Sequence, residues 1–165
     1  MRPAWAQPHL RIINMGQSLV QNYSHLIFST KHRTPWLQPE ALQNELFQYL
    51  GKICSNHNCP PLLVGGHIDH IHILCRISKS ISIETLIREL KTSSSKWMKT
   101  QTLEHREFCW QNGYASISVS STHLNSLVRY IEQQKEHHST VTFQDEFRRI
   151  LKKNKIQFDE KYLWE

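Results

Sequence analysis

Two kinds of apolar pattern divide the chain into predicted strands and helices. Short runs of apolar and β-branched residues predict strands at 22–30, 62–64, 70–77 and 114–120. Apolar residues recurring at three- and four-residue steps predict helices at 39–55, 82–100, 122–137 and 143–153. This order of elements, with one glycine turn between strands, predicts an α+β fold in which a single antiparallel sheet is covered by helices, ferredoxin-like or RRM-like in outline.

The predicted strand 70–77 has one wholly apolar face. Because successive side chains of a strand point to opposite faces, Ile71, Ile73, Cys75 and Ile77 share one face, and His70, His72, Leu74 and Arg76 share the other. The apolar face is expected to lie in the core. That leaves the histidine face as the candidate surface.

Two histidines on one face of a strand form a candidate metal site. His70 and His72 can offer two imidazole nitrogens to one ion, and His67 and Asp69 lie directly upstream as groups that could hold these ligands in orientation. The chain contains 11 histidines, so the alternative of surface histidines without a metal stays open.

The predicted helix 122–137 carries a tyrosine away from its apolar stripe. At about 100° per residue, Tyr130 lies about 110° from the middle of that stripe, with His123, Gln134 and His137 within about 40° of it. Gln134 can bring a carbonyl oxygen to a metal, and Tyr130 can present a nucleophilic phenol beside it. Three protein ligands leave positions open for phosphate and water. Because imidazole is a softer ligand than Mg²⁺ prefers, we expect this site to bind Mg²⁺ weakly and to work well with Mn²⁺.

Length, charge and cysteine content narrow the classes of function. The chain has 165 residues, enough for one domain, and a formal net charge of +6, which favours a polyanionic partner such as nucleic acid. Residues 1–17 lack a sustained pattern and are expected to be a disordered extension before a domain at 18–165. No CxxC pair, leading apolar segment or membrane-length apolar run is present, so we expect a cytoplasmic protein without a membrane partner.

Basic side chains gather at two places where they could contact DNA phosphates. Lys31 and Arg33 follow the first strand, and a stripe along the predicted helix 82–100 contains Arg88, Lys91, Lys96 and Lys99. A solvated helix face is the alternative interpretation of this stripe.

Five segments together resemble the single-tyrosine HUH transposases of the IS200-like class and their REP-associated relatives. They are 23–31 (YSHLIFSTK), 66–72 (GHIDHIH), 90–97 (LKTSSSKW), 110–114 (WQNGY) and 130–138 (YIEQQKEHH). The resemblance runs from about residue 18 to the end of the chain and implies the HUH variant of the predicted fold.

The resemblance also implies roles for individual residues. His70, His72 and Gln134 would be the ligands of Mg²⁺ or Mn²⁺, and Tyr130 would attack single-stranded DNA to give a 5′-phosphotyrosine intermediate and a free 3′-OH. The resemblance further implies an obligate homodimer that binds hairpins at the ends of its element. In such a dimer the helix that carries the tyrosine can dock on the partner subunit. A transposase at the nucleoid of a bacterial or archaeal cell is therefore expected.

Two other functions stay open from the residues alone. One is a domesticated or noncatalytic module that binds single-stranded or hairpin DNA through aromatic and basic side chains. The other is a metal-dependent hydrolase that uses water and has no need of Tyr130.

Overall fold

The computed structural model describes residues 18–138 and 140–164. The extension expected at 1–17 lies outside the described residues.

The centre of the fold is one four-stranded antiparallel sheet, which confirms the predicted fold class. Its strands are β1 (Tyr23–Ser29), β2 (Pro61–Gly66), β3 (His70–Arg76) and β4 (Ala115–Val119). Their spatial order is β2-β3-β1-β4, so β1 and β3 are central and β4 is an edge strand. With one helix between β1 and β2 and another between β3 and β4, this is the ferredoxin-like arrangement.

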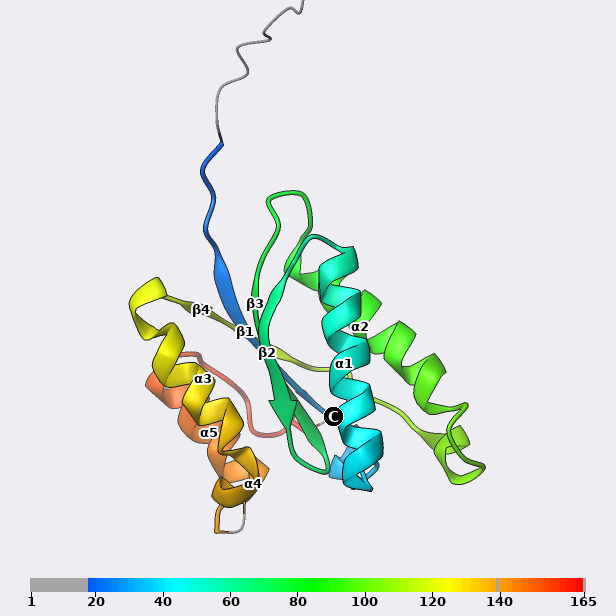
Figure 1. Ribbon diagram of the computed structural model, residues 1–165. Coiled ribbons are helices and arrows are strands. Elements are labelled where there is room, and N and C mark those ends of the chain that lie inside the picture. The colour runs from blue at the N-terminus through cyan, green and yellow to red at the C-terminus, as the bar shows by residue number, and fades with distance from the viewer. Residues whose placement is uncertain (1–17, 139, 165) are drawn as a thin grey trace, which may run out of the picture.

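The first helical layer covers the apolar face of β3. It consists of α1 (Glu40–Asn56) and α2 (Ile83–Met98), which lie on the same side of the sheet (Figure 1). Ile71 and Ile73 pack there against Leu46, Leu50 and Leu90 in the larger of the two apolar clusters. The alternation of β3 therefore fixes which face α1 and α2 cover.

A second helical layer covers the opposite face (Figure 1). It consists of a 3₁₀ turn (Ser121–His123), α3 (Leu124–Glu132), α4 (Gln134–His137) and α5 (Phe143–Lys153). A smaller apolar cluster holds α5 to the sheet and comprises Ile27, Ala115, Ile117, Phe143, Phe147 and Leu151. The sheet is thus buried on both sides.

The predicted helix 122–137 is not continuous. Gln133 separates α3 from α4, with φ −86° and ψ 11°, and its N–H donates to the Arg129 carbonyl. The other predicted helices correspond to α1, α2 and α5 within a few residues at each end. None of the described helices has the length and apolar character needed to cross a membrane.

Candidate active site

His70 and His72 lie on the central strand β3 and are completely buried. Both side chains are 0 % exposed, because α4 and α5 cover the face of the sheet from which they project. The prediction that the histidine face is a surface is therefore wrong. Both faces of β3, the apolar one and the histidine one, lie in the interior. The two histidines line a closed polar site between the sheet and the second helical layer.

The Nδ1 atoms of His70 and His72 each contact a polar side chain of the sheet or of the loop before β3. Asp69 Oδ1 lies 2.7 Å from His70 Nδ1, and His25 Nε2 on β1 lies 2.8 Å from His72 Nδ1. Burial lowers the pKa of His25 to about 4, so this imidazole is neutral. Both contacts leave the Nε2 atoms directed toward the second helical layer, which is the arrangement that metal-binding histidines require.

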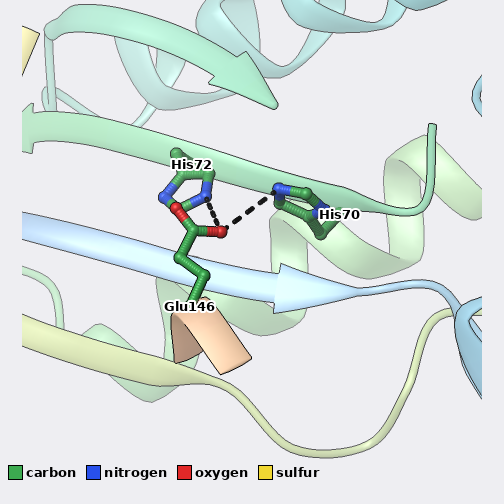
Figure 2. A group of neighbouring side chains, drawn as sticks. All are labelled: His70, His72 and Glu146. Atoms are coloured by element: carbon green, nitrogen blue, oxygen red, sulfur yellow. Dashed lines mark ion pairs between the residues drawn. The ribbon is translucent and has the colours of Figure 1, made fainter. Parts of the chain in front are cut away.

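Glu146, which the sequence analysis did not single out, enters the same site from α5 (Figure 2). Its side chain is 2 % exposed, and its Oε2 atom lies 3.8 Å from His70 Nε2 and 3.8 Å from His72 Nε2. One ligand atom from each of these three residues lies within 4.8 Å of the others, a spacing at which they could hold one metal ion. A signal existed in the sequence, since position 146 is next to Phe147 and three residues after Phe143 in the buried stripe of α5.

Gln134 and Tyr130 complete the cluster. Gln134 is 1 % exposed. Its Oε1 lies 3.2 Å from His70 Nε2, and its Nε2 donates to Glu146 Oε1 at 2.9 Å. The Tyr130 hydroxyl donates to the same carboxylate oxygen. The Tyr130 ring stands edge-on to the His72 ring, with centroids 6.1 Å apart. The tyrosine, the glutamine and both histidines thus meet within one chain, whereas the resemblance implies that a partner can supply the tyrosine.

The break at Gln133 brings a further histidine into the site. His138 Nε2 lies 2.9 Å from Gln134 Oε1 and 2.8 Å from Glu146 Oε2. His67 stacks on the His138 ring with centroids 5.3 Å apart. His137, which the sequence analysis placed near Tyr130, has a side chain outside the described part of the structure.

The environment of Glu146 changes its acidity. Burial raises the pKa of this carboxyl to about 8, while the Arg149 guanidinium opposes the shift and Asp69 adds to it. The Tyr130 hydroxyl donates a hydrogen bond to this carboxyl, and the ionised form of the carboxyl can accept the phenol's proton.

The amino-acid sequence matches a known family over most of the domain. The model of the family described as "Transposase IS200 like" matches residues 18–134. The chain belongs to the IS200-like transposase family. The matched segment contains the two β3 histidines, Tyr130 and Gln134, and it ends before α5, so Glu146 lies outside it.

Two solved structures share the fold of this IS200-like family member. A candidate transposase from Deinococcus radiodurans R1 superposes with a TM-score of 0.57 at 22% identity, covering 74% of this chain and 98% of the other. A REP-associated tyrosine transposase bound to a REP hairpin gives a TM-score of 0.56 at 12% identity, covering 77% and 74%. No curated protein sequence matches the chain significantly.

Five of the six predicted DNA-contacting residues lie in three different settings. Arg88, Lys96 and Lys99 are exposed on or just after α2, across the sheet from the histidines. Lys31 is exposed after β1, whereas the Arg33 guanidinium lies 5.3 Å from the Trp164 ring centroid. These five stay predictions.

Lys91 differs from the rest of the predicted stripe. Its Nζ donates to the carbonyls of Gln111, Asn112 and Gly113 at 2.7, 3.0 and 2.8 Å. Burial also lowers the pKa of this ammonium to about 8. Lys91 therefore fastens the loop before β4 to α2, and its donors are already used within the chain.

Proposed function

We propose that this IS200-like family member cleaves and rejoins single-stranded DNA through a covalent 5′-phosphotyrosine at Tyr130. The observation that carries the proposal is the position of the Tyr130 hydroxyl, which donates to a buried carboxylate that also faces both β3 histidines. A nucleophile, a proton acceptor and a cluster of metal-capable donors therefore lie in contact.

The chain's own groups account for the proton and the bond changes. Glu146 accepts the Tyr130 proton as the phenolic oxygen forms its bond to phosphorus and the bond from phosphorus to the 3′ oxygen breaks. The 3′ oxygen leaves with the electron pair of that bond and takes up a proton from water to become the 3′-OH. A phenol with a pKa of about 10 needs such help. Burial raises the pKa of the Glu146 carboxyl to about 8, so its ionised form is a stronger base than an exposed carboxylate and the difference between the two pKa values is smaller. The phosphotyrosine bond keeps the energy needed for rejoining.

The donor set fits a divalent cation. His70 and His72 would supply Nε2 atoms, with oxygen from Gln134, as the resemblance implies, or from Glu146, as its distances to both histidines allow. A bound Mg²⁺ or Mn²⁺ would polarise the scissile phosphate. Titration of Mn²⁺ into the Gln134→Ala and Glu146→Gln variants shows which of the two oxygens is the ligand. The variant that has lost the true ligand should have the lower affinity for Mn²⁺.

A covalent adduct tests the proposal. Wild-type protein, Mn²⁺ and a random-sequence single-stranded DNA library should give a protein–DNA species that survives denaturant, and Tyr130→Phe should abolish it. Tyr162→Phe removes an exposed hydroxyl elsewhere and should leave the adduct intact. An adduct that persists in Tyr130→Phe contradicts the assignment. Cleavage without adduct indicates a hydrolase, and DNA binding without cleavage indicates a noncatalytic module.

Tyrosine and metal ligands are proposed to act within one chain. The contacts of Tyr130 with Glu146 and His72 support this, since all three belong to the same chain. A mixture of Tyr130→Phe with His72→Ala should then form no adduct, because neither chain has a complete site. Recovery of the adduct in the mixture would show that the tyrosine acts on a partner's histidines, as in the dimer that the resemblance implies.

Hairpin DNA is the proposed partner. The fold relative that was solved bound to a REP hairpin supports this, and the net charge of +6 agrees with a nucleic-acid ligand. The expected homodimer stays a prediction, to be tested by sedimentation.

A further inference from the structure

Tyr130 opens onto a groove between the edge strand β4 and helices α3 and α5. The groove has a volume of about 620 Å³, within the range of about 300–1,000 Å³ that holds small ligands. Tyr130 lines it together with the buried side chains of Glu146 and His25, which form its inner end. His70, His72 and Gln134 are almost completely buried. In the part of the chain that the structure describes, a DNA strand can therefore reach the Tyr130 hydroxyl through this groove.

One face of α5 supplies positive charge along this groove. Glu146, Arg149 and Lys153 all line it and recur at three- and four-residue steps, which places them on one side of the helix. The carboxylate is at the inner end, and the two exposed cations follow it outward, about 6 Å apart along the helix axis. Glu146 is the one acidic group among the described lining residues.

The rest of the lining suits a base. Ile117, Leu127 and Ile150 give apolar surface, and Ser118, Ser120 and Ser126 offer hydroxyls. Apolar surface with a few hydrogen-bonding groups is how proteins hold an unstacked base.

We propose that this groove holds one unpaired deoxynucleotide beside the scissile phosphate, and that Arg149 and Lys153 bind the phosphates of that strand. The proposal rests on the proposed function, because it names where the substrate of Tyr130 lies. Both cations lie beyond the segment that the family model matches.

Neighbouring cations on the same helix provide a charge-matched control. Arg148 bonds to Asp145 at 3.2 Å and to Glu160 at 2.9 Å, and its guanidinium lies over the Trp164 ring. Lys152 is exposed and does not line the groove. Replacing Arg148 and Lys152 by glutamine removes as much charge from α5 as replacing Arg149 and Lys153, but none of it from the groove.

The salt dependence of binding distinguishes these pairs. Affinity for single-stranded oligodeoxythymidylate is measured in EDTA by fluorescence anisotropy over a range of salt concentrations. Removal of one cation that binds a phosphate should reduce the slope of log K against log [salt] by about 0.7. Arg149→Gln/Lys153→Gln should therefore reduce it by about 1.4, and Arg148→Gln/Lys152→Gln should leave it near the wild-type value. Equal slopes for the two double variants would overturn the proposal.

Filling the groove tests the occupant independently of charge. Ser126→Trp places an indole in the groove from α3 and should abolish both oligonucleotide binding and the Tyr130 adduct. Asn125→Trp adds the same bulk at the adjacent exposed position, which does not line the groove, and should behave as wild type. Normal binding by a folded Ser126→Trp variant would overturn the proposal.

The two proposals fail in different ways. If the wild type forms the adduct but the groove variants bind and react normally, the groove proposal fails and the proposed function stands. If the wild type forms no adduct, the proposed function fails whatever the slopes are.

Discussion

Gly65 on β2 controls how closely the tyrosine helix approaches the sheet. A Cβ atom at this position would lie 2.6 Å from Ile131 Cγ2 and 3.3 Å from the Ile131 carbonyl oxygen on α3. Ile131 is buried and β-branched, so its side chain has little rotational freedom within the helix. The Gly65→Ala substitution must therefore displace α3, and with it the adjacent Tyr130.

The size of the effect follows from overpacking. Inserting a methyl group into a closely packed contact costs about 1–3 kcal/mol. We expect Gly65→Ala to lower the free energy of unfolding by that amount in urea denaturation. Because Tyr130 moves with the helix, its rate of adduct formation should fall by more than the fraction of unfolded protein explains.

Gly51 in α1 supplies a control of opposite sign. A Cβ atom there would lie 3.6 Å from Pro61 Cγ and 3.9 Å from Val64 Cγ2, which are ordinary contact distances. Alanine also favours a helix interior over glycine by about 0.5–1 kcal/mol, so Gly51→Ala should raise the free energy of unfolding. If Gly65→Ala proves as stable as Gly51→Ala, α3 does not dock on β2 as described.

Three further substitutions test other contacts. His25→Leu removes the partner of His72 Nδ1 and should weaken Mn²⁺ binding about 10–100-fold by calorimetry; an unchanged affinity would show that His72 needs no such support. Ser94→Ala leaves the buried Trp110 indole N–H without its 2.9 Å acceptor and should cost about 1–3 kcal/mol in urea denaturation, and no loss would mean that another acceptor replaces it. Burial raises the Glu146 pKa from 4.5 to about 8, so in EDTA its contribution to stability is present below 4.5 and lost as pH rises through about 8. In the Glu146→Gln variant the free energy of unfolding should no longer fall as the pH rises through about 8. A pH profile identical to that of the wild type would contradict the raised pKa of Glu146.

The sheet and the first helical layer were predictable from local pattern. Alternation along 70–77 assigned Ile71 and Ile73 to one face of β3, and that face packs against α1 and α2. The coverage of the other face was missed, although a signal was present. Two amphipathic helices follow the last strand, and the histidine side of the sheet was the remaining large face on which they could pack.

The identity of the helical residues in the site was less predictable. A continuous helix over 122–137 would place Gln134 and His137 beside Tyr130. The interruption at Gln133 changes the direction of the helix that follows, and His138 contacts Gln134 Oε1. Since one residue corresponds to about 100° around a helix, a single break is enough to bring His138 to the site.

Glu146 shows where local pattern stops being informative. Periodicity can place a residue on a face of its element, but it cannot tell which faces of distant elements meet. The family resemblance supplied that information for Tyr130, Gln134 and the two β3 histidines, whose meeting the structure reproduces. The matched segment ends at residue 134, so it does not include α5, and the local pattern predicted this helix without showing where it packs. A carboxylate within an apolar stripe is costly to bury without partners, and that cost was the one available reason to expect a polar site beneath α5.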